Sequence, residues 1–137
     1  MTKKEKGFTL LELLVVIGII SMLVGVLSVS YSAAQKRGRD SRRRSDTKAM
    51  QEALEQYYAE NTYSYPSGDC NEADDYLKGA WPTTDPSGES YEGADACAAA
   101  SYCLCALMEV ENTGNAADAS CTWSGGSLDY YCVGNLQ

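Results

Sequence analysis

The chain has 137 residues with 19 acidic and 11 basic side chains, a formal net charge of −8, and no histidine. Residues 1–48 hold ten bases and four acids, a balance of +6, whereas residues 49–137 hold one base and fifteen acids, a balance of −14. The acidic C-terminal part makes nucleic acid an unfavourable partner. Without histidine, a G-x-S-x-G motif or a phosphate-binding glycine loop, we expect no enzyme active site.

The first predicted element is an apolar segment at residues 8–35, which is long enough to cross a membrane as a helix. Its only charged side chain is Glu12. A carboxylate inside a bilayer costs roughly 2.5 to 3.5 kcal/mol on insertion scales, so an acid without a partner would weaken insertion. We therefore expect Glu12 to have a partner and a function.

The residues before and around Glu12 form a pattern with fixed spacing. A short basic leader at residues 1–7 ends in Gly7, Phe8 follows, and then come Thr-Leu-Leu-Glu and the apolar run. The pattern resembles the class III leader and N-terminal helix of type IV pilins and pseudopilins. The resemblance implies that a prepilin peptidase cuts between Gly7 and Phe8 and N-methylates Phe8. It also implies that Glu12, the fifth residue of the cut chain, serves filament assembly.

Two interpretations of Glu12 follow from its chemistry. Cleavage would give Phe8 an α-amino group, for which the ordinary pKa is about 7.7 to 8.0, and Glu12 of one subunit could neutralise the amine of its neighbour. A subunit added out of register would then leave two charges buried without partners. The alternative is a capping box, because Thr9 and Glu12 fit the S/T-x-x-E pattern that opens a helix. The two roles are compatible, and we favour assembly.

The predicted helix continues beyond the membrane segment to about Asn61, because no proline occurs before Pro66. An amphipathic continuation at residues 36–61 follows the membrane segment, and a globular head fills residues 62–137. Apolar side chains recur at spacings of three and four and predict a stripe that packs on a sheet; they are Ala49, Met50, Ala53, Leu54, Tyr57 and Tyr58. The predicted fold class is α+β: a long N-terminal helix, half transmembrane and half amphipathic, on a small antiparallel sheet. The resemblance implies the same arrangement, the pilin fold.

Basic residues on both sides of the apolar segment give conflicting signals about orientation. The positive-inside rule counts Lys3, Lys4 and Lys6 on one side and a larger cluster at residues 36–44 on the other. The leader and the cysteines favour an exterior head. Within the cluster, Arg42, Arg43 and Arg44 are candidates for an intersubunit basic patch, with a solvated helix face or anionic lipid contact as alternatives.

The head contains six cysteines, which we expect to form disulfides in an oxidising compartment; they are Cys70, Cys97, Cys103, Cys105, Cys121 and Cys132. Cys103 and Cys105 share one face of a predicted strand and should have different partners. Our best guess for one pair is Cys121 with Cys132, across a hairpin.

Strand patterns occur only in the second half of the head. Residues 102–110 alternate between apolar and polar, with Tyr102, Leu104, Ala106, Met108 and Val110 on one face. Residues 120–123 and 129–133 flank a Ser-Gly-Gly-Ser turn and predict a hairpin. Residues 69–98 are predicted to be a loop region with little regular structure.

The loop region also raises the question of calcium, since it is rich in acids: Asp69, Glu72, Asp74, Asp75, Asp85, Glu89, Glu92 and Asp95. It lacks EF-hand spacing, and acidic loops are usually just solvated. We expect no metal site and no cofactor.

The resemblance and the residues together predict a structural subunit of a type IV pilus. The expected partners are other copies of the chain in a homopolymer, the prepilin peptidase, and a pilus assembly platform in the membrane. The precursor would be a single-pass protein of the inner membrane, and the assembled form an extracellular pilus. The alternatives are a type II secretion pseudopilin and a membrane-anchored extracellular binding module that does not polymerise.

Overall fold

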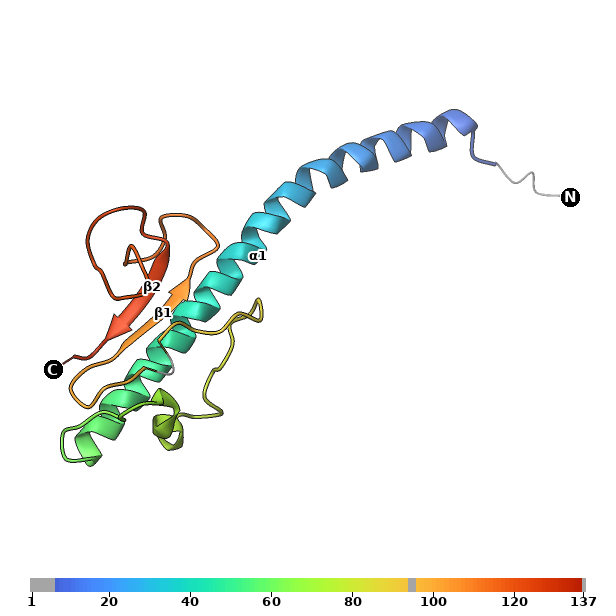
Figure 1. Cartoon of the computed structure of the whole chain (residues 1–137). Helices are drawn as coiled ribbons and strands as arrows, with labels where there is room; N and C mark the ends of the chain where they lie inside the picture. The colour runs from blue at the N-terminus through green and yellow to red at the C-terminus, as the bar shows by residue number, and fades with distance from the viewer. Residues whose placement is uncertain (1–6, 94–95, 137) are drawn as a thin grey trace, which may run out of the picture. The chain divides into compact units, whose positions relative to one another are not determined.

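The computed structural model describes residues 7–93 and 96–136. Its elements are, in order, α1 (Leu10–Glu60), the 3-10 helix η1 (Cys70–Tyr76), β1 (Cys103–Leu107) and β2 (Tyr130–Gly134) (Figure 1). The chain divides into two compact units, residues 1–35 and 36–137. The predicted leader residues 1–6, with their three lysines, and the acidic residue Asp95 lie outside the described residues.

Helix α1 confirms the prediction of one continuous helix, since it begins and ends within two residues of the predicted bounds. The helix ends where Thr62 and Tyr63 take left-handed φ angles of 56° and 58°. The Tyr63 N–H still donates to the Tyr58 carbonyl, at 3.1 Å, so one carbonyl of the last turn keeps a partner. Pro66 follows and prevents any return to helix.

The buried stripe of α1 is longer than the apolar pattern predicted. Met50, Ala53 and Leu54 are almost fully buried, and Tyr57 and Tyr58 pack partly against the same core. The stripe continues toward the N-terminus at the same spacing through three polar residues, Asp40, Arg43 and Thr47, which are all buried. This extension was missed because polar side chains at helical spacing usually indicate a solvated face.

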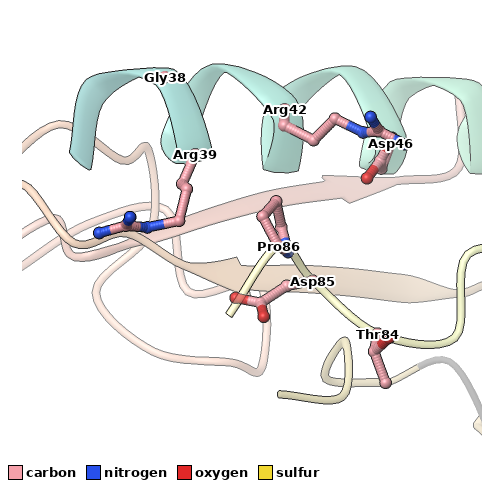
Figure 2. Close-up of a pocket in the computed structure, with 7 residues that line it drawn as sticks. All are labelled: Gly38, Arg39, Arg42, Asp46, Thr84, Asp85 and Pro86. Atoms are coloured by element: carbon pink, nitrogen blue, oxygen red, sulfur yellow. The ribbon is translucent and has the colours of Figure 1, made fainter. Parts of the chain in front are cut away.

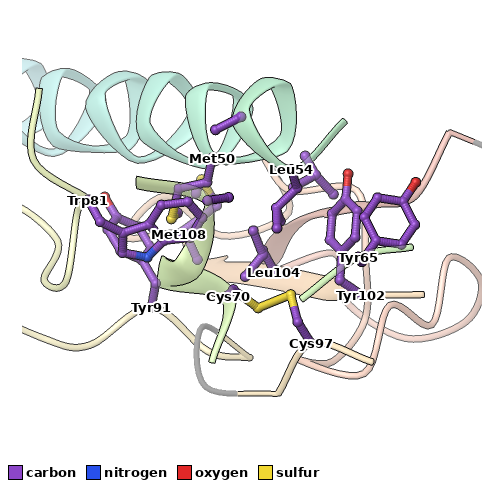
Figure 3. Close-up of a cluster of buried hydrophobic side chains, with 14 residues drawn as sticks. Met50, Leu54, Tyr65, Cys70, Trp81, Tyr91, Cys97, Tyr102, Leu104 and Met108 are labelled. Atoms are coloured by element: carbon purple, nitrogen blue, oxygen red, sulfur yellow. A yellow bond between two sulfur atoms is a disulfide. The ribbon is translucent and has the colours of Figure 1, made fainter. Parts of the chain in front are cut away.

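Strands β1 and β2 form a two-stranded antiparallel sheet beside the C-terminal part of α1 (Figure 1). Leu104 lies opposite Val133, and both are buried. The strand is shorter than the predicted 102–110, and Val110, which lies beyond it, is half-buried. Most of the predicted apolar face is buried, namely Tyr102, Leu104, Ala106 and Met108. Met50, Leu54, Trp81 and Tyr91 join them in the core (Figure 3). The α+β prediction is therefore confirmed.

The predicted hairpin at residues 120–133 is wrong. Strand β2 pairs with β1, and residues 120–123 form a loop in which Cys121 has a left-handed φ of 56°. The Asp118 carboxylate accepts N–H groups from Ser120 and Thr122, which closes this loop on itself. Trp123, the largest apolar side chain of this segment, is 54% exposed and does not belong to the core.

Three disulfides join the six cysteines: Cys70–Cys97, Cys103–Cys121 and Cys105–Cys132. Our guess of a Cys121–Cys132 pair is wrong, whereas the expectation of different partners for Cys103 and Cys105 is confirmed. The guess failed because β2 lies opposite β1, which places Cys132 directly across from Cys105. The loop region predicted to lack regular structure contains η1, which begins at Cys70 and is tied by its disulfide to Cys97.

Candidate processing and assembly site

The N-terminus of α1 is opened by two side chains that bond reciprocally. The Thr9 N–H and hydroxyl both donate to Glu12 Oε2, each at 2.8 Å, and the Glu12 N–H donates to Thr9 Oγ1 at 3.2 Å. This arrangement is a capping box, in which two N–H groups at the helix start gain acceptors. The Glu12 carboxylate therefore points back toward Phe8 and not toward the C-terminal turns.

The side chains around this cap form an apolar surface that is unfavourable in contact with water. Phe8 is 87% exposed, and the large apolar side chains from Leu10 to Val26 are exposed on all sides of the helix. By length and composition, α1 contains a segment that can cross a membrane. A helix that is apolar all round requires lipid or other protein around it. Glu12 is the only charged side chain between Phe8 and Gln35.

The compact unit at residues 36–137 contains a second group of charged residues, centred on Arg43 of α1, which is only 3% exposed. Its guanidinium donates to Asp85 Oδ2 at 2.6 Å, to Asp40 Oδ1 at 2.7 Å and to Glu109 Oε1 at 2.8 Å. A fourth bond reaches Ser87 Oγ at 2.8 Å. One buried arginine thus connects α1 with two segments that are 42 and 66 positions away in the sequence.

The carboxylates around Arg43 have further partners. Glu109 accepts two bonds of 2.6 Å from Arg39, in bidentate geometry, and Asp40 accepts the N–H groups of Glu109 and Val110. The bonds from Arg39 and then Arg43 lower the pKa of Glu109 from 4.5 to about 2, against the opposing effect of burial. Burial would raise the pKa of Asp85, but the Arg43 bond and two backbone N–H groups outweigh it and lower that pKa. Both carboxylates are ionised at neutral pH.

The comparisons with known proteins concern the N-terminal part. Residues 2–28 match the family described as the prokaryotic N-terminal methylation motif. The chain carries a class III prepilin leader of the type IV pilin-like kind. No curated protein and no solved structure matches the chain. The match covers the leader and the first part of the apolar helix, and with that helix it fits a membrane-anchored precursor of the type IV pilin-like kind.

The predicted site residues of the pilin-like chain fall into separate places. Gly7, Phe8 and Glu12 lie together at the start of α1. Of the three candidate arginines, Arg43 is bonded to acids of its own chain, and Arg44 donates to the Thr113 carbonyl and stacks over the Tyr131 ring. The side chain of Arg42 is 72% exposed and pairs loosely with Asp46, at 3.4 Å.

Arg42 borders a surface pocket of about 410 Å³ between α1 and the head (Figure 2). The pocket lies between one side of α1 and the loop at residues 84–86, and its lining residues are Gly38, Arg39, Arg42, Asp46, Thr84, Asp85 and Pro86. The guanidinium of Arg39 is already held by Glu109, so Arg42 is the cation of this pocket with the weakest internal partner.

Sequence reasoning missed the three acids that hold Arg43. Asp40 could have been found, because Asp40, Arg43 and Thr47 continue the stripe of Met50 and Leu54 at spacings of three and four. Asp85 and Glu109 come from distant segments, and no local pattern marks them. Asp85 belongs to the acidic loop region that was interpreted as solvated, and Glu109 to the predicted strand at residues 102–110.

Proposed function

We propose that the chain is a structural subunit of a type IV pilus, which polymerises through its N-terminal helix into an extracellular filament. The observation that carries the proposal is Glu12, a single carboxylate at the start of an exposed apolar helix, directly after the Gly7–Phe8 step. In this proposal residues 1–7 are the leader, 8–35 the membrane and assembly helix, 36–61 its amphipathic continuation and 62–137 the head.

The capping box explains how the Glu12 carboxylate is stabilised in the membrane before assembly. Before assembly, the Glu12 carboxylate is bonded by the N–H and hydroxyl of Thr9, at 2.8 Å each, so the isolated subunit does not hold a bare acid in lipid. Cleavage after Gly7 creates an amine on Phe8, and in the filament the amine of a neighbour pairs with Glu12. Pairing of opposite charges in a low dielectric favours the correct axial register.

The exposed apolar surface supplies the driving force for assembly. Side chains such as Leu13, Ile17 and Ile20 are more than half exposed in the single chain. In the membrane they contact lipid, and on leaving it they must contact the same surface of other subunits, because apolar burial stabilises by about 25 cal/mol per Å². The head is polar and acidic, which suits the outside of such a filament.

Two variants separate the assembly role of Glu12 from its capping role. Glu12→Gln keeps a carbonyl that can accept from Thr9, as capping boxes allow, but removes the charge. Thr9→Val keeps the charge and removes the hydroxyl. We expect Glu12→Gln to insert into the membrane and give no surface filaments, and Thr9→Val to give filaments in near-normal amounts.

The measurement is electron microscopy and immunoblotting of material sheared from cells, with the membrane fraction as the control for insertion. Normal filaments from Glu12→Gln would refute the assembly role. The alternative is a type II secretion pseudopilin. If wild-type cells shed no filaments, and cells that lack this chain lose protein secretion, the chain is a pseudopilin.

A further inference from the structure

The two disulfides at the sheet end of the head are in direct contact. Cys103 Sγ lies 3.6 Å from Cys105 Sγ, although these sulfurs belong to different disulfides. All four sulfurs of Cys103, Cys105, Cys121 and Cys132 lie within 4.8 Å of one another. A thiolate produced at any one of them would therefore have a disulfide sulfur of the other pair within reach.

The two disulfides differ in their access to solvent. Cys105 and Cys132 are fully buried, at 0% and 1% exposure, and form a small core with Ala116. Cys103 and Cys121 are half-buried at the edge of this core. Cys121 lies in a loop between the exposed residues Ser120 and Thr122, so we take it as the point of attack for an external thiolate.

We propose that Cys103–Cys121 is a thiol-exchange site, and that an external thiolate attacking there re-pairs the buried Cys105–Cys132 disulfide from inside the head. The external thiolate attacks Cys121 Sγ, forms a mixed disulfide with it and releases the Cys103 thiolate. This thiolate attacks Cys105 Sγ, forms Cys103–Cys105 and releases the Cys132 thiolate. Cys132 then attacks Cys121 Sγ, which forms Cys121–Cys132 and expels the original thiolate.

The circuit changes no oxidation state, because each step forms one disulfide and breaks one, and the external thiol is recovered. The alternative pairs are Cys103–Cys105 and Cys121–Cys132, and the first of them needs a long Cα separation for a disulfide. Two residues along a strand place the Cα atoms of Cys103 and Cys105 about 6.6 Å apart, at the upper end of the 4.4 to 6.8 Å that a disulfide spans. The native pairs are therefore favoured over the alternative pairs at equilibrium.

The Cys70–Cys97 disulfide lies outside this circuit. Its sulfurs are not among the four that converge, and both residues belong to the main hydrophobic core. It provides the matched control, because it can be removed by the same kind of double substitution.

The test is the rate at which reduced glutathione opens Cys105–Cys132 in the full-length chain in mild detergent, followed by alkylation and peptide mapping. In the Cys103→Ser/Cys121→Ser variant we expect this rate to fall at least about tenfold, since an internal thiolate acts at a far higher effective concentration than the added thiol. The Cys70→Ser/Cys97→Ser variant should keep the wild-type rate. If Cys103–Cys121 only shielded its neighbour, its loss would expose Cys105–Cys132 and speed its reduction. An unchanged or faster rate in the Cys103→Ser/Cys121→Ser variant therefore overturns the proposal.

A second measurement uses the wild-type chain, so it does not depend on the folding of a variant. Brief treatment with glutathione is stopped with acid, which protonates thiolates with an ordinary pKa of about 8.5 and halts exchange. We expect molecules that carry glutathione on Cys121 and a Cys103–Cys105 link. If every trapped molecule with bound glutathione retains Cys105–Cys132, the exchange does not occur.

Discussion

Replacing Glu109 with glutamine tests how far the charged group around Arg43 stabilises the head. The pKa of Glu109 falls from 4.5 to about 2 in the folded protein, which corresponds to at most about 3 kcal/mol at neutral pH. The side chain is 23% exposed, so screening by solvent reduces this figure, and we expect a loss of about 2 kcal/mol for Glu109→Gln. In a folded unit of about a hundred residues this lowers Tm by roughly 10 °C.

The stabilising effect of Glu109 depends on pH. Because the pKa of Glu109 is lowered on folding, its contribution is fully present above about pH 4.5 and is lost as the pH falls through about 2. Thermal unfolding of the full-length chain in mild detergent, followed by near-ultraviolet circular dichroism, should show a difference between wild type and Glu109→Gln that disappears toward pH 2.

The matched control is Glu111→Gln, which changes an exposed carboxylate two residues away and should leave Tm within about 2 °C of wild type. A Glu109→Gln difference that is the same at pH 7 and pH 2, or no larger than that of Glu111→Gln, would refute the reasoning.

Two further predictions use the head. Gly93 has a φ of +81°, and a Cβ there would lie 2.0 Å from the Cys103 carbonyl oxygen, so Gly93→Ala should destabilise by about 3 kcal/mol or more in thermal unfolding. Gly88→Ala, at φ +91° in open space, should cost only about 1 to 2 kcal/mol, and equal losses would contradict this account. Arg42→Glu should leave Tm nearly unchanged and reduce the filament yield most strongly at low salt, as quantified in sheared material; an unaltered yield would remove Arg42 from the proposed intersubunit contact.

The parts of the fold that the sequence predicted are those with local periodicity. Helix α1 follows from an uninterrupted run without proline, and its packing face from apolar spacing at Met50, Ala53 and Leu54. The buried side of β1 follows from alternation around Leu104. In each case the signal lies within one element, so no knowledge of distant contacts was needed.

The parts that the sequence did not predict depend on pairing between distant segments. Residues 120–123 are close to β2 in the sequence and were predicted to pair with it. The structure shows that β2 pairs with β1 instead. The disulfide pairs follow from that register. The burial of Arg43 depends on Asp85 and Glu109, whose positions relative to α1 have no local signature. The candidate assembly residue Glu12, in contrast, is visible from sequence, since a single acid in an apolar membrane segment is a functional candidate by default.

The N-terminus of the mature chain is the most direct test of the central claim. The account predicts that protein purified from its native membrane or from filaments begins at Phe8, with an N-methyl group on its amine, as read by N-terminal peptide mass spectrometry. A chain that retains Met1 through Gly7 in the membrane and in every surface fraction would contradict it, because Glu12 would then have no amine in a neighbouring subunit to pair with.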